Sequence, residues 1–220
     1  VADATPSLVI DARTLAVLHA ENPGRPWYPA STTKLVTALV AFDALRDGRV
    51  TLQTDVVFSA NALRQESVRS GLKPGSVMTL EDALYAMLGA SANDAAVAIA
   101  ETIAGDEARF VAMMNAAARR VGMTGSHFAN PEGLFEPSQV TTARDLALLA
   151  ATIDRLYPEY RRFFGVSEVR IDGRTLTSQN LLLTRFAGAV GLKTGFLCAS
   201  GRNIVGLAER DGRRLIVVVL

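Results

Sequence analysis

The sequence predicts an α+β fold, in which one antiparallel sheet is built from N- and C-terminal strands and is flanked by helices. Two observations support this prediction. Short runs with strand character occur near the N-terminus and again after Val166, whereas helical patterns fill the middle of the chain. In addition, 220 residues are enough to bury the core of one domain, even one with two lobes. We therefore expect a helical lobe inserted into a sheet.

The first part of the chain is expected to supply two strands and a buried helix. Residues from Ser7 to Ile10 and from Leu15 to Ala20 have strand character and are joined by a four-residue turn. Apolar residues then recur at spacings of three and four at Leu35, Leu39, Phe42 and Leu45. This spacing predicts a helix from about Ser31 to Arg46. The polar segment from Gln65 to Gly75 is expected to lie at the rim of a site.

Helices with recognisable capping residues are expected in the middle of the chain. The expected elements are a helix opened by Thr79 and broken at residues 89–92, a helix capped by Asn93 and Asp94 that runs to about Ala104, a helix from Asp106 to Val121 stopped by Gly122, and a helix from Ala143 to Arg155 capped by Thr142. These patterns predict a mainly helical region between the two sets of strands.

Strands return in the last quarter of the chain. They are expected at Val169 to Ile171, Ala189 to Phe196, Asn203 to Glu209 and Arg214 to Leu220, with a hairpin turn at Asp211-Gly212. We interpret residues 1–220 as a single catalytic domain. Its sheet lobe comprises about 1–30 and 166–220, and its helical lobe comprises about 31–165.

The composition argues against several classes of function. The chain has 23 basic and 22 acidic residues, so its charge gives no indication of nucleic acid or an anionic membrane as a partner. The single cysteine, Cys198, excludes an internal disulfide and a cysteine-based zinc site. The two histidines do not begin a metal-ligand pattern, and we expect no metal or other cofactor. No apolar run approaches the roughly 20 residues of a membrane span.

Ser31 and Lys34 form the first candidate catalytic pair. Residues three apart on a helix share a face, so the hydroxyl and the amine can touch. The N-terminus of a helix also offers unpaired backbone N–H groups that favour negative charge. The alternative is that Ser31 only caps the helix and that Lys34 is a solvated residue of its first turn. Ser70 and Lys73 have the same spacing, but Gly71 and Pro74-Gly75 predict a loop there.

Two further motifs can complete a site. Ser91-Ala92-Asn93 falls at a break between two expected helices, where a hydroxyl and an amide can project into a cleft. The same pattern recurs at Ser59 and Ser178, so the motif alone is weak. Lys193-Thr194-Gly195 occurs on an expected strand, where Lys193 and Thr194 can hold a carboxylate and Gly195 lets a ligand backbone lie close.

The choice of basic residues favours lysine chemistry at two of these positions. The chain has three lysines, at positions 34, 73 and 193, and its other twenty basic residues are arginine. Lysine can act as a base when its pKa is depressed, whereas arginine stays protonated in proteins. Lysine at positions 34 and 193 is therefore consistent with a catalytic role.

Together the three motifs resemble those of the D-alanyl-D-alanine carboxypeptidases, the low-molecular-mass penicillin-binding proteins. The segments from Gly122 to Leu134 and from Lys193 to Gly201 also resemble this family, so the resemblance spans nearly the whole chain. It implies a β-lactamase/transpeptidase-like fold. It also implies a serine DD-carboxypeptidase that removes the terminal D-Ala from peptidoglycan stem peptides and is acylated by β-lactams.

The resemblance implies a role for each motif residue. Ser31 would be the nucleophile, Lys34 its base, and Ser91 a proton relay toward the leaving amine. Asn93 would hold the substrate amide, and Lys193, Thr194 and Gly195 would bind the terminal carboxylate and the substrate backbone. The backbone N–H groups of Ser31 and Phe196 would form the oxyanion hole. The base must lose about 3 pKa units, which burial and a nearby Lys193 can supply.

The chain departs from the family pattern at several positions. Ala92 stands where the family usually has glycine, and Phe196 where some members have histidine. Gln179 stands where some relatives have arginine, so the contacts to the substrate carboxylate are expected to differ from theirs. Cys198 is close enough to the last motif to pack at the rim of the site or to modulate it. The family usually continues beyond the last strand, so we interpret the end at Leu220 as a truncation.

Other functions remain open on the sequence alone. A DD-endopeptidase, a β-lactamase of the same fold, and a catalytically silent peptidoglycan-binding relative are the alternatives. No Glu-x-x-Leu-Asn segment for fast deacylation lies between Ser91 and Lys193. The substrate would place the protein in the periplasm or elsewhere outside the cytoplasm, with Val1 following a removed segment and possible membrane attachment through a missing C-terminal part. Stem-peptide preference and oligomeric state are not predicted.

Overall fold

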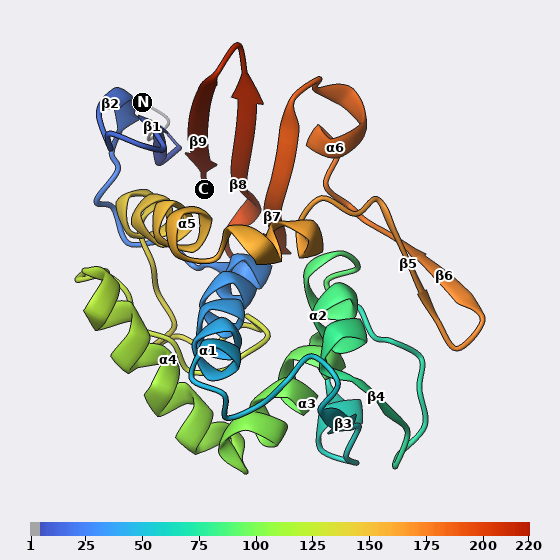
Figure 1. Ribbon diagram of the computed structural model, residues 1–220. Helices are drawn as coiled ribbons and strands as arrows, with labels where there is room; N and C mark the ends of the chain where they lie inside the picture. Colours follow the sequence, from blue (N-terminus) through green and yellow to red (C-terminus); the bar gives the residue numbers. More distant parts are fainter. Residues whose placement is uncertain (1–4) are drawn as a thin grey trace.

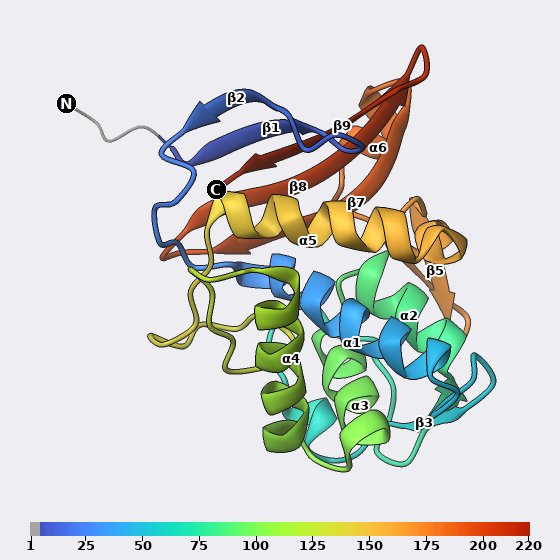
Figure 2. The same ribbon diagram turned by 60° about the vertical axis from the view of Figure 1, so that its left-hand side comes forward.

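The computed structural model describes residues 5–220, and Val1 lies outside this range. Five strands form one antiparallel sheet in the order β2-β1-β9-β8-β7 (Figures 1 and 2). The bounds are Ser7–Asp11 for β1, Val17–Glu21 for β2, Ala189–Leu197 for β7, Gly201–Arg210 for β8 and Arg213–Val219 for β9. The sheet is built from the two ends of the chain, as predicted.

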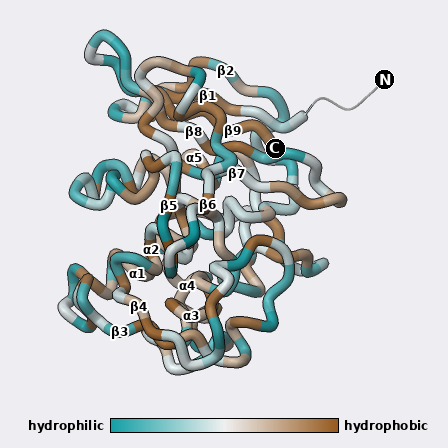
Figure 3. Tube along the Cα trace, turned by 90° about the vertical axis from the view of Figure 1, so that its right-hand side faces the viewer, coloured by the Kyte–Doolittle hydropathy of each residue, from teal (hydrophilic) through white to brown (hydrophobic). Residues whose placement is uncertain are grey.

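The pairing of β1 with β9 joins the two ends of the chain. Ile10 lies opposite Ile216, and Leu8 lies opposite Val218, with all four side chains buried. Alternate residues of a strand point to the same face, so this register directs one apolar row toward the core. Hydrophobic stretches follow β1 and β9 in Figure 3. The register therefore fixes which face of the sheet packs on the helices.

The longer helices lie on one side of this sheet (Figure 2), whereas Leu182 of the last, short helix lies against Gly206 on the other face. Their bounds are Lys34–Arg46 for α1, Leu80–Leu88 for α2, Asn93–Ala104 for α3, Glu107–Val121 for α4, Ala143–Leu156 for α5 and Leu182–Arg185 for α6, with 3₁₀ turns η1 at Ala30–Thr33, η2 at Ala62–Arg64 and η3 at Pro158–Phe163. Two further two-stranded sheets pair β3 Asp55–Val57 with β4 Val77–Thr79 and β5 Glu168–Ile171 with β6 Arg174–Thr177. No helix within residues 5–220 has the length and apolar character needed to cross a membrane.

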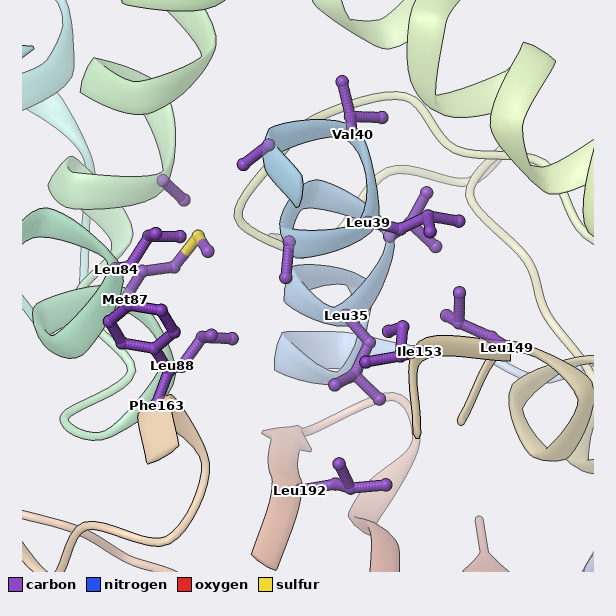
Figure 4. Close-up of a cluster of buried hydrophobic side chains, with 14 of the residues drawn as sticks. Leu35, Leu39, Val40, Leu84, Met87, Leu88, Leu149, Ile153, Phe163 and Leu192 are labelled. Atoms are coloured by element: carbon purple, nitrogen blue, oxygen red, sulfur yellow. The ribbon is translucent and has the colours of Figure 1, made fainter. Parts of the chain in front are cut away.

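Helix α1 lies at the centre of the helical region. Eleven of its thirteen residues are buried, which explains why its apolar side chains occur on all sides. Figure 4 shows Leu35 and Leu39 of α1 between Leu84 and Met87 of α2 and Ile153 of α5. The site residues at the start of α1 are therefore carried by a helix that is packed on every side.

Helix α5 packs against the sheet (Figures 1 and 2). Its buried apolar residues include Leu149 and Ile153, which lie toward α1 and β7 in Figure 4. The lobe boundaries drawn from the sequence place this helix in the helical lobe. In the structure it forms the layer between the sheet and α1, because its apolar stripe faces β9 and β1.

Most helix boundaries agree with the sequence pattern, with one clear exception. Thr79 and Thr142 accept hydrogen bonds from Asp82 and Asp145 backbone N–H groups, as capping residues do. The expectation that Asn93 and Asp94 cap α3 is wrong. The N-cap is Ala92, without a side-chain bond, since the Asn93 side chain is used inside the molecule. The short elements β4, η3 and α6 were not predicted, because their sequences show no clear period.

The C-terminal end of α1 is fixed by a buried carboxylate. Asp43 accepts hydrogen bonds from Arg46 at 3.0 Å, from Arg120 of α4 and from the hydroxyl of Tyr157 at the end of α5. Phe42 beside it lies against the rings of Tyr157 and Tyr160. Asp43 therefore connects three helices at the end of α1 opposite the site.

We expect Asp43→Ala to lower the free energy of unfolding by about 1–3 kcal/mol, because the buried Tyr157 hydroxyl would lose its partner. Asp47→Ala is the matched control at the exposed end of the same helix and should change stability by less than about 0.5 kcal/mol. Urea denaturation followed by circular dichroism measures both. Equal effects of the two substitutions would contradict the buried role of Asp43.

Candidate active site

The site lies where the first turn of the central helix meets the edge strand of the sheet. Ser31 is in η1, directly before α1, and Gly195 of β7 lies against it. A Cβ atom on Gly195 would come within 2.9 Å of the Ser31 backbone nitrogen. The glycine therefore allows β7 to approach the serine backbone, whereas the sequence suggested room for a ligand backbone. Ala30, just before Ser31, has a φ of 51°, which is rare for a residue with a side chain.

Lys34 is buried beside Ser31. Its Nζ donates hydrogen bonds to Ser31 Oγ at 3.0 Å, to Asn93 Oδ1 at 2.6 Å and to the backbone carbonyl of Glu132 at 2.6 Å. The lysine has no exposed surface. The alternative that Lys34 is a solvated first-turn residue is therefore wrong, and the expected contact with Ser31 is present.

The surroundings of Lys34 favour its neutral form. Burial lowers the pKa of the amine well below its ordinary value, and the charge of Lys193 lowers it further. The carboxylates of Glu132 and Asp94 act in the opposite direction. The loss of solvent is the largest effect, so the net shift is toward the neutral amine, whose lone pair could take the Ser31 proton.

Asn93 connects Lys34 to the loop at the rim. Its Oδ1 accepts from Lys34, and its Nδ2 donates to the backbone carbonyl of Glu66 at 2.7 Å. Next to it, the Asp94 carboxylate accepts from the backbone N–H and the hydroxyl of Ser70. The start of α3 therefore fixes the expected rim segment through two side chains. One hydrogen of the Asn93 amide is left for another partner, because an amide group has two.

Ser91 and Lys193 form the second polar pair of the site. Lys193 Nζ donates to Ser91 Oγ and to the Thr194 carbonyl, both at 3.0 Å. Burial lowers the pKa of Lys193 to about 7. Ser91 has a φ of 63°, and Leu192, next to Lys193, has a φ of 134°. Positive φ values at residues with side chains are energetically costly and concentrate at functional sites.

A cavity of about 230 Å³ joins these groups. Its lining comprises Ser31, Ser67, Val68, Ser91, Asn93, Glu132, Gly133, Leu134, Gln179, Thr194, Gly195, Phe196 and Leu197. The Phe196 side chain is 62% exposed, so its ring lies at the rim. Cys198 is exposed and outside this lining, so a packed position for it is wrong. The structure therefore brings together all the residues that the motifs selected.

The repeated motif patterns do not form a second site. Ser70 Oγ is bonded to Asp94, and Lys73 is exposed in a loop. Ser59 accepts from the Ala62 backbone, and Asn180 accepts from the Leu182 backbone. Ser59 and Asn180 therefore serve local turns, and Ser70 is already held by the distant Asp94.

One polar residue of the site was not predicted from its chemistry. Glu132 lines the cavity and is 3% exposed. Burial raises the pKa of its carboxyl to about 7. The sequence offered one signal, an acidic residue between Pro131 and Gly133, but nothing in it placed that residue beside Lys34.

Comparison with known proteins gives one family for the whole chain. A family model described as D-alanyl-D-alanine carboxypeptidase matches residues 2–220. The D-alanyl-D-alanine carboxypeptidase DacF of Bacillus subtilis is 32% identical over 222 residues, which cover 99% of this chain and 57% of the relative. The chain thus spans little more than half the length of this curated relative.

Solved structures show the same fold. Penicillin binding protein 5 from Haemophilus influenzae has a TM-score of 0.95 and 31% identity, over 99% of this chain and 65% of that one. Penicillin-Binding Protein D2 from Listeria monocytogenes, solved in a cefotaxime-bound form, has a TM-score of 0.88 and 31% identity, over 99% of this chain and 89% of that one. The predicted transpeptidase-like fold is therefore confirmed.

The three lysines allow a direct measurement of the site electrostatics. In a protein labelled with ¹³C at lysine Cε, we expect two of the three signals to titrate abnormally low, with Lys193 near pH 7. The substitution Lys73→Arg removes and so assigns the exposed lysine. A Lys34 signal that titrates near the ordinary value of about 10.4 would contradict the effect of burial.

Proposed function

The chain belongs to the D-alanyl-D-alanine carboxypeptidase family, and on this premise we propose that it is a serine DD-carboxypeptidase acting on peptidoglycan stem peptides. One observation carries the proposal. Lys34 is fully buried and holds its Nζ 3.0 Å from Ser31 Oγ, in surroundings that favour the free amine. A nucleophile with an adjacent base is the arrangement that covalent acyl transfer requires.

Acylation begins at Ser31. Its Oγ attacks the carbonyl carbon of the penultimate D-Ala while Lys34 takes the hydroxyl proton. The carbonyl oxygen becomes an oxyanion, which the backbone N–H groups of Ser31 and Phe196 would stabilise. Collapse of this intermediate breaks the C–N bond and leaves an ester on Ser31. Water then hydrolyses the ester and restores the serine.

The leaving amine of D-Ala needs a proton, and Ser91 is its proposed donor. Ser91 Oγ lies 3.0 Å from Lys193 Nζ, which can replace the proton that the hydroxyl gives away. With a pKa of about 7, Lys193 can give or take a proton near neutral pH. The strained backbone at Ser91 keeps its hydroxyl in the cavity.

The other motif residues would hold the substrate. Lys193 and Thr194 would bind the terminal carboxylate, whose charge in turn favours the ammonium form of Lys193. The remaining Asn93 hydrogen would bind the substrate amide, and Gly195 keeps β7 close enough to receive the peptide backbone. Gln179, which also lines the cavity, supplies a neutral amide where an arginine could otherwise contribute charge.

Further proposals follow from this activity. The partners would be peptidoglycan stem peptides ending in D-Ala-D-Ala and β-lactams as covalent inhibitors. The cefotaxime-bound relative supports the second partner. Such a substrate lies outside the cytoplasm, so the protein would act in the periplasm or at the cell wall. Residues 1–220 would form one catalytic domain, since the site is made from the helices and the sheet together.

Labelling with a fluorescent penicillin tests the roles of Ser31 and Lys34. We expect Ser31→Ala to abolish the mass increase of the labelled protein and Lys34→Ala to slow labelling by at least about 10³-fold. Lys73→Ala, in the exposed repeat of the motif, is the matched control and should label at the parent rate. Equal labelling of Ser31→Ala and the parent would refute the acyl-enzyme.

Substrate comparison separates the proposed activity from its alternatives. We expect D-Ala release from a monomeric pentapeptide to exceed both cleavage of a cross-linked dimer and turnover of nitrocefin. Faster cleavage of the dimer would assign a DD-endopeptidase, and rapid nitrocefin turnover would assign a β-lactamase. Labelling by penicillin without turnover of any of these substrates would indicate a catalytically silent peptidoglycan-binding protein.

A further inference from the structure

Glu132 is a buried ionisable group of the site that the proposed chemistry does not use. Its backbone carbonyl accepts from Lys34 Nζ at 2.6 Å, and its side chain belongs to a residue that is 3% exposed. Oε2 of the carboxyl is buried and has no hydrogen-bond partner within residues 5–220. An unpaired buried carboxyl oxygen is costly, so such an atom calls for a functional explanation.

The loop that carries Glu132 is held firmly on both sides. Thr37 of α1 donates to the Pro131 carbonyl at 2.6 Å, and the Gly133 N–H donates to Asn130 Oδ1 at 2.8 Å. A Cβ atom on Gly133 would lie 2.1 Å from the Ala30 carbonyl oxygen, so this loop packs directly against the backbone before Ser31. Glu132 therefore stays close to the start of α1.

Five charged groups determine the electrostatics around Lys34 and Glu132. Burial raises the pKa of the Glu132 carboxyl to about 7, with a smaller contribution from Glu107, while the charge of Lys34 acts in the opposite direction. Lys34 in turn faces Lys193, which disfavours its ammonium, and Asp94 and Glu132, which favour it. Asp94 already accepts from Ser70 and from the Ala95 N–H. Glu132 is thus the acidic neighbour of Lys34 with a free carboxyl oxygen.

We propose that Glu132 is a positioning residue whose carboxylate stabilises the ammonium formed when Lys34 takes the Ser31 proton. This deepens the proposed function and rests on it. In the step, the proton moves from Ser31 Oγ to Lys34 Nζ as the Oγ–C bond forms and the carbonyl electrons move to oxygen. The new ammonium would otherwise face Lys193 with no surface exposed to solvent. Glu132 supplies the compensating negative charge.

The sign of the effect follows from the interaction between the two groups. A carboxylate near Lys34 raises the pKa of the amine, which makes Lys34 a stronger base but requires a higher pH to free it. Removing the carboxylate should therefore lower the plateau rate of acylation and move the acid limb of the pH profile to lower pH. A purely structural contribution would lower the plateau and leave the limb in place.

The test is the pH dependence of acylation by a fluorescent penicillin, measured by stopped flow on the parent and on Glu132→Gln. We expect the plateau to fall by about 10- to 100-fold. The acid limb should move to lower pH by about one unit. Glu132→Asp, which keeps the charge, should restore part of the plateau and move the limb back toward the parent position. Glu136→Gln, an exposed glutamate in the same segment, is the matched control and should leave both unchanged.

Titration of the Lys34 ¹³Cε signal in the same variants separates this proposal from the proposed function. A lower Lys34 pKa in Glu132→Gln supports the proposed interaction between the Glu132 carboxylate and the Lys34 ammonium. An unchanged Lys34 pKa in Glu132→Gln overturns the proposal. A lower plateau rate of acylation with the acid limb of the pH profile in its parent position also overturns it. If penicillin fails to acylate the parent protein, the proposed function fails, while the titration still reports on Glu132. Thermal unfolding checks that each variant is folded. If Glu132→Gln does not fold, the Lys34 pKa is compared between Glu132→Asp and the parent instead.

Discussion

The burial of one lysine is the constraint on which the site depends. An amine without exposed surface must find all its hydrogen-bond partners inside the protein, and Lys34 finds three, on η1, on α3 and on the loop before α5. Each partner belongs to a different segment, so the three segments must converge on the start of α1. The same burial lowers the pKa of the amine. Structure and reactivity therefore come from a single desolvated group.

Much of the fold could be predicted because its elements have clear periods and caps. The apolar spacing in α1, the Thr142 cap of α5 and the hairpin at Asp211-Gly212 are local signals, and the structure contains all three elements. Asn93 was misinterpreted as a capping residue because Ser, Asn and Asp near a helix start usually bond the backbone. In this protein its amide is used by Lys34 and Glu66, and a tertiary contact of this kind leaves no local pattern in the sequence.

In the candidate site, too, the residues that belong to sequence motifs could be predicted, whereas those placed by tertiary contacts could not. Ser31, Lys34, Ser91 and Lys193 belong to short motifs, so their types and order could be predicted. In the structure the two serines line one cavity, and each is bonded to one of the lysines. Glu132 has no such motif. Its position depends on Thr37 and on the Asn130 network, which fold a loop against α1. The positive φ values at Ala30, Ser91 and Leu192 were equally unpredicted, because the surrounding packing imposes them on residues that do not favour them.

The contact between Gly195 and the Ser31 backbone also determines the stage of folding at which the site forms. These residues are more than 160 positions apart in the sequence, and β7 reaches its place only by pairing with β8 from the C-terminal end. Contacts of such long sequence separation form late, because closing a long loop must precede them. A chain still emerging from the ribosome thus has its nucleophile but lacks the strand that completes the site. The complete site around Ser31 therefore depends on the C-terminal strands being in place.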